Sequence, residues 1–272
     1  MVNIKIYNIV IKLDFLFLND FISLNKYITK DDNQYIIKSY PNMDFVMPRK
    51  SPDAITKFYD LYQFDDHIIQ IQKDNDTILG AIIYTNNEIS LFMKNPSFQL
   101  EYLLSQYAIA YIINKHNAII MHGSSLKYKN KGIIFTAKSG TGKSTHSRLW
   151  QKYSDALVIN DDKNIIAIEN DKLVLYPSCW SGKHMLDNNI TSTLDCIVFL
   201  YQSPTNIVNK ISKVEAMKRI IGQVQLPTIN NKETWNKIID KLLELPIYLY
   251  GCNMEYEAFE TICKELERTL CL

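Results

Sequence analysis

Hydrophobic and polar positions alternate at short range in the first part of the chain. Up to about residue 95, β-branched runs are separated by polar turns such as Asp74–Asp76 and Thr85–Asn87. This pattern predicts a β-meander. Pro96 then precedes Phe98–Asn114, where apolar residues recur at helical spacing, so a long helix is expected there.

From residue 118 onward, strands and helices are expected to alternate. The predicted strands are Ala118–Met121, Ser125–Tyr128, Ile133–Thr136, Ala156–Ile159, Ile165–Ile168, Leu173–Tyr176, Asp195–Tyr201 and Ile247–Tyr250. Helices are expected after the loop at 137–142, from Val214 onward and over Glu255–Leu270. The sequence therefore predicts an α/β protein in which a smaller β-rich region, residues 1–97, precedes a domain of residues 98–272.

Composition restricts the function classes without selecting one. The chain has 30 Lys and Arg against 29 Asp and Glu, a net charge of +1, which argues against a nucleic-acid coat protein or a polybasic membrane-surface protein. Its five cysteines include no CxxC pair, so we expect reduced thiols and a cytoplasmic location rather than a disulfide framework or a zinc ribbon. No uncharged run reaches the roughly 18 residues of a membrane helix.

The sharpest chemical signal is a glycine-rich loop between a predicted strand and a predicted helix. Residues 137–145 read AKSGTGKST, which matches the P-loop (Walker A) pattern except that Ala137 replaces the first glycine. In such a loop, backbone N–H groups and the positive end of the helix dipole face a phosphate. Lys143 would reach the β- and γ-phosphates, and the Ser144 hydroxyl would bind Mg²⁺. The expected nucleotide-binding residues are Ser139, Gly140, Thr141, Gly142, Lys143, Ser144 and Thr145.

Two adjacent acids follow the next predicted strand. Asp161 and Asp162 come just after Ala156–Ile159, and Asp161 follows Lys143 by 18 residues. Neighbouring residues within a strand point to opposite faces, but at a strand end both carboxylates can turn toward the phosphate site. One acid would bind Mg²⁺ and the other would accept the proton of an acceptor hydroxyl. A solvated Asp-Asp turn is the alternative that these residues leave open.

A histidine, His122, lies at a strand end one predicted hairpin before the loop. Its imidazole could assist proton transfer or bind the phosphoryl group in transfer. A lone histidine usually has a structural role, and both interpretations stay open at this stage.

Together these segments resemble a known enzyme family. The run MHGSSLKYKNKGIIFTAKSGTGKST, followed by LVINDDK, is similar to the catalytic domain of HPr kinase/phosphorylase, which shares its core with ATP-dependent phosphoenolpyruvate carboxykinase. The similarity spans about residues 115–250. It is greatest to small HPr-kinase-like proteins of bacterial peptide-tailoring and regulatory gene neighbourhoods, some of which resemble lasso-peptide precursor kinases.

The resemblance carries expectations about both the fold and the site. It implies a P-loop core made of a mixed sheet with flanking helices. It also places His122 and Asp161 at catalytic positions and Ser144 and Asp162 at metal-binding positions. The roles of the two acids could be exchanged.

The chain departs from the pattern of that family at two points. Thr145 stands where HPr kinases carry an acid, as in the carboxykinase pattern. The sequence has no convincing copy of the second HPr kinase signature, the glycine-rich loop that engages HPr, so HPr itself is in doubt as the acceptor. A carboxykinase is not expected either, because 272 residues are too few for the substrate-binding arginines and metal-binding residues of that family.

A second glycine-containing segment lies between predicted strands. Trp180-Ser181-Gly182-Lys183 is similar to a Trp-x-Gly-Lys segment of the small HPr-kinase-like proteins. Lys183 would be a third catalytic residue that neutralises charge on the γ-phosphate when the loop folds over it. The alternative is a tight loop whose Trp180 fills the edge of the core and whose lysine is solvated. Two other basic residues, Lys138 and Arg219, are expected to be solvated, although each could reach phosphate.

The sequence therefore predicts an ATP- and Mg²⁺-dependent phosphotransferase, a kinase that moves the γ-phosphate to a hydroxyl. The acceptor would be a serine of a peptide or small protein, or a small alcohol. Neither a nucleic acid nor a membrane is an expected partner, while a homo-oligomer and GTP or pyrophosphate as donor stay open. The alternative from another class is a catalytically silent ATP-binding module that senses nucleotide and presents a peptide or protein partner.

Overall fold

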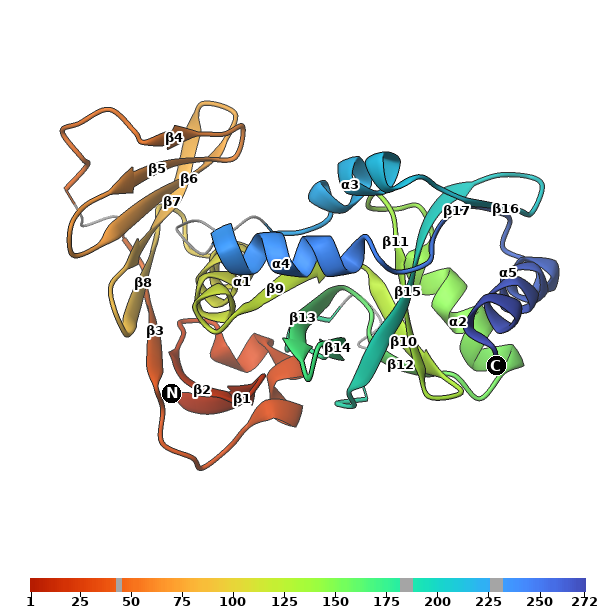
Figure 1. The fold of residues 1–272 in the computed structure, drawn as a ribbon. Coiled ribbons are helices and arrows are strands. Elements are labelled where there is room, and N and C mark those ends of the chain that lie inside the picture. The colour runs from red at the N-terminus through yellow and green to blue at the C-terminus, as the bar shows by residue number, and fades with distance from the viewer. Residues whose placement is uncertain (43–45, 182–187, 226–231) are drawn as a thin grey trace. The chain divides into compact units, whose positions relative to one another are not determined.

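The computed structural model describes residues 1–42, 46–181, 188–225 and 232–272. The chain divides into two compact units, Met1–Ile112 and Ile113–Leu272, each with its own β-sheet (Figure 1). Helix α1 (Phe98–Lys115) crosses from the first unit into the second. The domain boundary between residues 97 and 98 stays a prediction.

The first unit is built on an eight-stranded sheet with the strand order β1-β2-β3-β8-β7-β6-β5-β4. Its strands are β1 (Val2–Ile6), β2 (Ile9–Asp14), β3 (Tyr35–Tyr40), β4 (Ala54–Ile55), β5 (Tyr59–Gln63), β6 (Ile68–Asp74), β7 (Thr77–Tyr84) and β8 (Glu88–Met93). Two short 3₁₀ helices, Leu18–Asp20 and Ile22–Tyr27, lie between β2 and β3.

The predicted meander is confirmed for only part of this sheet. Strands β4 to β8 pair antiparallel, each with the next along the chain. Strands β1 and β2 also pair antiparallel, but β3 pairs parallel with both β2 and β8, so the prediction is wrong at β3. Parallel neighbours cannot be joined by a tight turn. The chain leaves β3 at Tyr40 and enters the sheet again at its far edge, with β4.

The predicted long helix is confirmed as α1, which packs on this sheet. Its side chains at Leu104, Ala108 and Ile109 are fully buried. Gly80 on β7 permits the close approach, since a Cβ there would lie 3.2 Å from Leu104 Cδ1. The buried carboxylate of Glu101 accepts hydrogen bonds from the backbone N–H groups of residues 16 and 17, at 2.8 and 2.9 Å.

The second unit contains a nine-stranded mixed sheet with helices on both faces. Its strands are β9 (Ala118–His122), β10 (Ser124–Tyr128), β11 (Lys131–Thr136), β12 (Leu157–Asn160), β13 (Lys163–Glu169), β14 (Lys172–Tyr176), β15 (Ser192–Gln202), β16 (Ile207–Lys210) and β17 (Ile247–Cys252). The helices are α2 (Lys143–Tyr153), α3 (Lys213–Ile221), α4 (Lys232–Leu242) and α5 (Tyr256–Leu270). The predictions of an α/β protein, a mixed sheet with flanking helices and a β-rich N-terminal region are confirmed.

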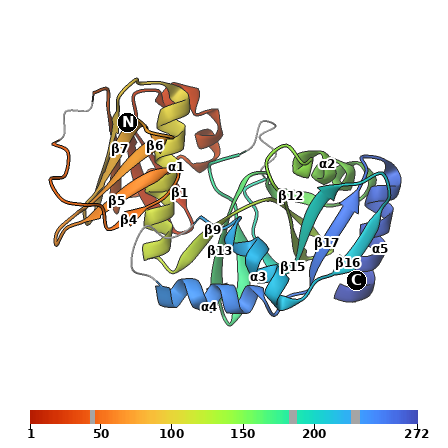
Figure 2. The same cartoon turned by 90° about the horizontal axis from the view of Figure 1, so that it is seen from above.

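The long strand β15 is the centre of this sheet. It pairs parallel with β11 and β17 and antiparallel with β14. Because successive side chains of a strand point to opposite faces, Val198 packs with α2 and α5 on one face and Phe199 packs with α3 on the other. Figure 2 shows these helices on the two sides of the sheet. The predicted apolar central strand is thus confirmed, with one core on each side.

A buried histidine anchors α2 to the sheet. His146 is fully buried, and its ring packs edge-on against Phe135, with 4.7 Å between the ring centroids. Its Nε2 accepts a hydrogen bond from Trp150 Nε1 at 3.3 Å, and Tyr250 packs against its ring. Burial penalises the charged imidazolium and lowers the pKa of His146 to about 3.

We expect His146 to make folding stability depend on pH in the acid range. The ordinary pKa of 6.5 in the unfolded chain means that, below this pH, the unfolded state binds a proton that the folded state excludes. The stabilisation is complete above about pH 6.5 and is lost as the pH falls toward 3, by up to about 1.4 kcal/mol per pH unit. Urea titrations between pH 7 and 4 should give a shallower decline for His146→Leu than for wild type. Parallel declines would contradict this role.

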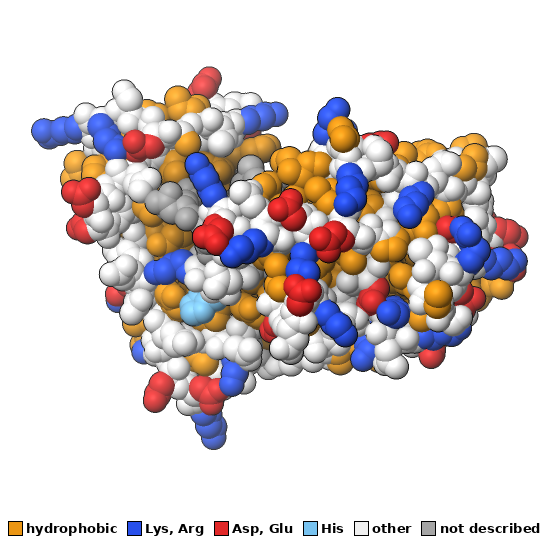
Figure 3. Space-filling view, viewed as in Figure 1, with side chains coloured by type: hydrophobic (Ala, Val, Ile, Leu, Met, Phe, Trp, Pro, Cys, Tyr) orange, Lys and Arg blue, Asp and Glu red, His pale blue; other side chains and the backbone are white. Residues whose placement is uncertain are grey.

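The cysteines and the molecular surface fit the composition. All five cysteines are free, and four of them are buried. In the described part of the chain, no helix is both long and apolar enough to cross a membrane. Figure 3 shows Lys and Arg mixed with Asp and Glu across the visible face, as the near-balance of charge implies.

Candidate functional site

The glycine loop, residues 137–142, connects β11 to α2, in the strand–loop–helix arrangement that the sequence predicts. Gly140 has a φ of +79° and Gly142 a φ of +107°, a backbone region that strongly favours glycine. A Cβ at Gly142 would also lie 2.2 Å from Met254 Cε. Thr141 closes the loop, since its N–H and its hydroxyl both donate to the Lys138 carbonyl, at 3.3 and 2.8 Å.

The side chain of Lys143 folds back into this loop. Lys143 is the first residue of α2 and is only 8 % exposed. Its Nζ donates to the backbone carbonyls of Ala137 and Lys138, at 3.1 and 3.3 Å. Burial lowers the pKa of Lys143, while the nearby negative charge of Asp162 acts in the opposite direction. The loop thus encloses a cationic side chain at the start of a helix.

The other residues predicted to bind nucleotide lie around this ammonium. Ser139 and Gly140 are exposed on the loop, while Ser144 and Thr145 are half-buried in the first turn of α2. The Thr145 hydroxyl accepts a hydrogen bond from Arg148 Nη2 at 3.3 Å. These residues surround one end of α2 with backbone and hydroxyl groups, which suits the binding of an anion.

The two predicted acids form the turn between β12 and β13. Asn160 holds this turn, since its Oδ1 accepts the backbone N–H groups of Asp162 and Lys163 at 2.9 and 2.8 Å. Its Nδ2 donates to the carbonyl of Ser178 at 2.8 Å. Asp161, at 2 % exposed, is buried in the turn. The acids therefore stand at a strand end in a turn fixed by buried polar groups.

Asp162 is the acid that lies close to both the histidine and the loop lysine. Its Oδ1 is 3.3 Å from His122 Nε2. Burial acts to raise the pKa of Asp162, but the hydrogen bond from His122 and the positive charges of Lys163, His122 and Lys143 outweigh it. The pKa consequently lies below its ordinary value, so Asp162 is ionised at neutral pH.

Gln223 completes this cluster and was missed by the sequence analysis. Its Oε1 lies 3.1 Å from His122 Nδ1 and accepts a hydrogen bond from the Thr136 hydroxyl at 3.1 Å. Its backbone carbonyl accepts the His122 N–H at 2.8 Å. His122 therefore has an oxygen within hydrogen-bond distance of each of its ring nitrogens. The one signal available in the sequence was the preceding Gly222, in a chain with eight glycines.

The segment after β14 is described only in its first half. Trp180 is 2 % exposed, as expected if it packs in the core. The Ser178 hydroxyl donates to the Lys163 carbonyl at 2.6 Å and ties this segment to the turn that carries the acids. Gly182 and Lys183 lie outside the described residues, so the catalytic role of Lys183 stays a prediction.

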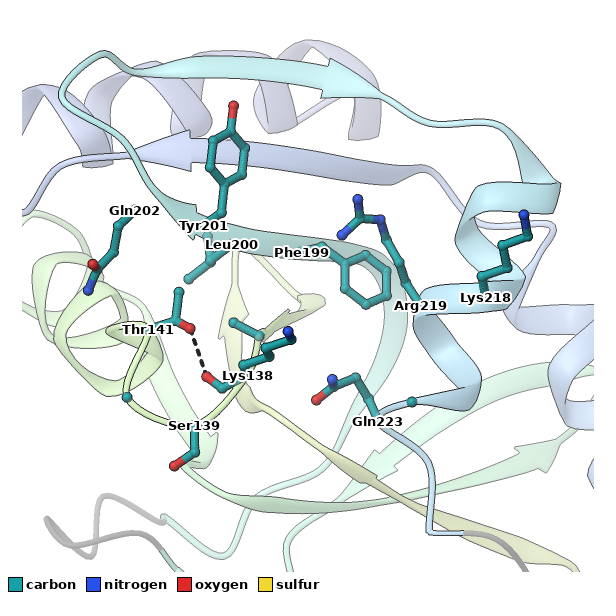
Figure 4. Close-up of a pocket in the computed structure, with 13 residues that line it drawn as sticks. Lys138, Ser139, Thr141, Phe199, Leu200, Tyr201, Gln202, Lys218, Arg219 and Gln223 are labelled. Carbon is teal, nitrogen blue, oxygen red and sulfur yellow. Dashed lines mark hydrogen bonds between the residues drawn. The ribbon is translucent and has the colours of Figure 1, made fainter.

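A cavity of about 750 Å³ opens beside the glycine loop (Figure 4). Its lining residues are Ala137, Lys138, Ser139, Gly140, Thr141, Phe199, Leu200, Tyr201, Gln202, Lys218, Arg219, Gly222 and Gln223. The guanidinium carbon of Arg219 lies 5.9 Å from the centre of the Phe199 ring. Lys138 and Arg219, expected to be solvated, therefore belong to the wall of a cavity at the site.

The site contains oxygen donors of the kind that Mg²⁺ binds. Among the residues that the structure describes, no group of three or more His, Cys, Asp or Glu side chains is placed to hold a metal ion. Mg²⁺ usually binds one or two carboxylates together with phosphate oxygens and water. The carboxylate of Asp162 and the hydroxyl of Ser144 are donors of that kind.

Comparisons with known proteins give a distant structural match. No family model matches the chain, and neither does any curated protein. A similar solved structure is the Hpr(Ser) kinase/phosphatase from Coxiella burnetii, with 13% sequence identity and a TM-score of 0.33. The match covers 56% of this chain and 97% of that chain.

Proposed function

We propose that the chain is an ATP- and Mg²⁺-dependent phosphotransferase of the HPr-kinase-like type, with the glycine loop as a P-loop. The observation that carries this proposal is the buried ammonium of Lys143 inside the glycine loop, with the ionised Asp162 close enough to act on its pKa. A cation, a helix start and an acid at one place suit a magnesium–triphosphate complex.

Each residue has a defined task in the proposed reaction. Lys143 and the loop N–H groups bind the β- and γ-phosphates of ATP. The acceptor hydroxyl oxygen forms a bond to the γ-phosphorus while the bond to the β–γ bridging oxygen breaks, and ADP leaves with that electron pair. The hydroxyl proton passes to the carboxylate of Asp161. Asp162 and Ser144 would hold Mg²⁺, which would supply positive charge beside the phosphates.

His122 would contribute charge rather than accept the proton. Its two ring nitrogens face Gln223 Oε1 at 3.1 Å and Asp162 Oδ1 at 3.3 Å, so the ring is held between two oxygens to which a protonated ring would donate. Positive charge near the phosphoryl group stabilises the charge that is shared during transfer. Gln223 acts through His122 and is therefore a positioning residue.

Replacing Gln223 with leucine should reduce the phosphoryl-transfer rate by about tenfold to a hundredfold, with little change in ATP affinity. The substitution removes the acceptor at His122 Nδ1 and leaves the loop contacts of Lys143 in place. Steady-state kinetics should show the loss in kcat rather than in KM for ATP. Gln223→Glu retains an acceptor and should restore much of the rate. Equal loss in both variants would assign Gln223 a purely structural role.

Titration calorimetry with Mg-ATP, combined with a phosphate-release assay, tests the proposed function. We expect one binding site per chain, tighter with Mg²⁺ than with EDTA, and slow phosphate release to water. Binding without any release or transfer would favour the alternative, a silent ATP-binding module. Absence of binding would remove both functions.

A further inference from the structure

The cavity beside the glycine loop has basic residues and no acidic ones. Lys138, Lys218 and Arg219 all line it, and none of its 13 lining residues is Asp or Glu. We propose that this cavity binds the phosphoryl acceptor, and that the acceptor is an acidic peptide segment with carboxylates beside the phosphorylated hydroxyl. This inference rests on the proposed kinase function and specifies the class of its substrate.

The position of the cavity suits the phosphoryl acceptor better than the Mg²⁺-bound phosphates of ATP. The carbonyls of Ala137 and Lys138 accept hydrogen bonds from Lys143 Nζ, and both residues line the cavity. In a P-loop the lysine reaches the β- and γ-phosphates, so the cavity borders the phosphate that is transferred. Ser144 and Asp162, the proposed Mg²⁺ ligands, are not among its lining residues.

One cavity residue also contacts the histidine that pairs with Asp162. Gln223 lines the cavity, and its Oε1 lies 3.1 Å from His122 Nδ1. His122 Nε2 in turn lies 3.3 Å from Asp162 Oδ1. A hydroxyl entering from the cavity would therefore approach the γ-phosphate on the side where His122 is held.

Arg219 is arranged to bind a carboxylate. Its Nε and Nη2 donate to Glu215 Oε1 at 3.0 and 2.8 Å, which orients the guanidinium over Phe199. A guanidinium has five N–H donors in a planar fork. Among the described residues Glu215 is the hydrogen-bond partner of Arg219, so several donors are left for a ligand. Figure 4 shows Arg219 and Lys138 on two walls of the same cavity.

The two lysines of the cavity, unlike Arg219, have no acidic partner among the described residues. Neither Lys138 nor Lys218 forms an ion pair with a residue that the structure describes, and both are exposed. Unpaired cations that surround one hollow attract an anion and disfavour a basic peptide. Glu215 partly offsets the charge of Arg219, whereas Lys138 and Lys218 keep theirs, so the cavity favours ligands of negative charge.

The size and apolar walls favour a peptide over a small hydroxy acid. About 750 Å³ lies within the range of pockets that enclose ligands of several hundred daltons. The side chains of Phe199 and Leu200 add apolar surface to the wall. A three- or four-carbon hydroxy acid would leave most of this space to water, whereas a peptide of a few residues would fill it.

Titration calorimetry with two blocked pentapeptides tests the inference. One peptide is acetyl-Asp-Glu-Ser-Asp-Glu-amide and the other is acetyl-Asn-Gln-Ser-Asn-Gln-amide, each titrated with and without Mg²⁺ and a non-hydrolysable ATP analogue. We expect the acidic peptide to bind at least about tenfold more tightly than the neutral one. A parallel titration with glycerate, a small hydroxy acid, should show weaker binding than that of the acidic peptide.

The charge-neutral double variant Lys218→Gln/Arg219→Gln should lose this preference and retain affinity for the ATP analogue. Lys210→Gln/Lys213→Gln is the matched control, because it removes two exposed lysines that do not line the cavity, and it should behave as wild type. Equal affinity for the two peptides, tighter binding of glycerate, or a loss of nucleotide affinity as large as that for peptide would each overturn the inference.

The failure of this inference differs from the failure of the proposed function. If the acidic peptide binds with the expected preference but receives no phosphate from Mg-ATP, the result supports the cavity as a binding site for acidic peptides and refutes the kinase assignment. If serine in the neutral peptide is phosphorylated as fast as in the acidic one, the result supports the kinase assignment and refutes the preference for an acidic acceptor.

Discussion

Replacing Lys143 with alanine should lower the affinity for ATP by at least about 100-fold. Lys143 is 8 % exposed, and its ammonium lies inside the glycine loop, where it donates to two backbone carbonyls. Loss of a buried charge that is hydrogen-bonded to phosphate typically removes this much binding. Calorimetric titration of wild type and variant with Mg-ATP measures the effect directly.

Urea unfolding distinguishes a specific loss of ATP affinity in Lys143→Ala from a loss of folded protein. Burial lowers the pKa of Lys143, which means that the fold disfavours the charged group. Lys143→Ala should therefore unfold at a urea concentration equal to or above that of wild type while its ATP affinity is lost. Lys152→Ala, at an exposed position on the same helix, is the matched control and should leave both properties unchanged. An unchanged ATP affinity in Lys143→Ala would refute the P-loop assignment.

Asp161→Asn should lower turnover by about 10²–10⁴-fold and leave Mg-ATP binding intact. The carboxylate is the proposed acceptor of the hydroxyl proton, and a positioned base contributes a factor of this size. Asparagine has nearly the same shape, so the buried turn that Asn160 holds should persist. Single-turnover phosphate transfer, measured beside calorimetric ATP binding, separates the two effects.

Asp162→Asn should instead raise the Mg²⁺ concentration needed for half-maximal turnover. Its ionised carboxylate is the proposed metal ligand, and neutralisation weakens its attraction for Mg²⁺. Asp171→Asn changes an exposed acid in the β13–β14 hairpin and serves as the control. The reverse pattern in the two variants would exchange the roles of the acids. Full activity in both Asp161→Asn and Asp162→Asn would show that the two acids have only a structural role in the turn.

The strands, helices and turns of the second unit could be predicted because a short stretch of sequence specifies each of them. The hairpin of β13 and β14 follows from apolar runs on both sides of a four-residue polar turn, Glu169–Lys172. The strand–loop–helix arrangement follows from the glycines and from Lys143, and the two acids follow from their place at a strand end. In each case the pattern and the structure that it specifies lie within about 20 residues.

Features that depend on distant pairing could not be predicted. Strand β3 pairs with β8, which begins almost 50 residues after β3 ends, and no local periodicity specifies that partner. Gln223 meets His122 only because the chain after α3 returns to β9, where Val224 pairs with Met121. Arg219 has the spacing of a solvated helix residue, and the ring of Phe199 beneath it comes from a different element. Contacts between side chains that are far apart in the sequence cannot be predicted from local sequence patterns.

The measurement that tests the central claim most directly follows the γ-phosphate itself. Mg-ATP is incubated with the wild-type protein, with and without the acidic pentapeptide, and ³¹P NMR records the signals of ATP, ADP, phosphate and phosphoserine. The proposed function predicts ADP formation that requires Mg²⁺, slow to water and faster to the peptide serine, and that is lost in Asp161→Asn. ATP that is bound by the protein but keeps its γ-phosphate under all these conditions would contradict it.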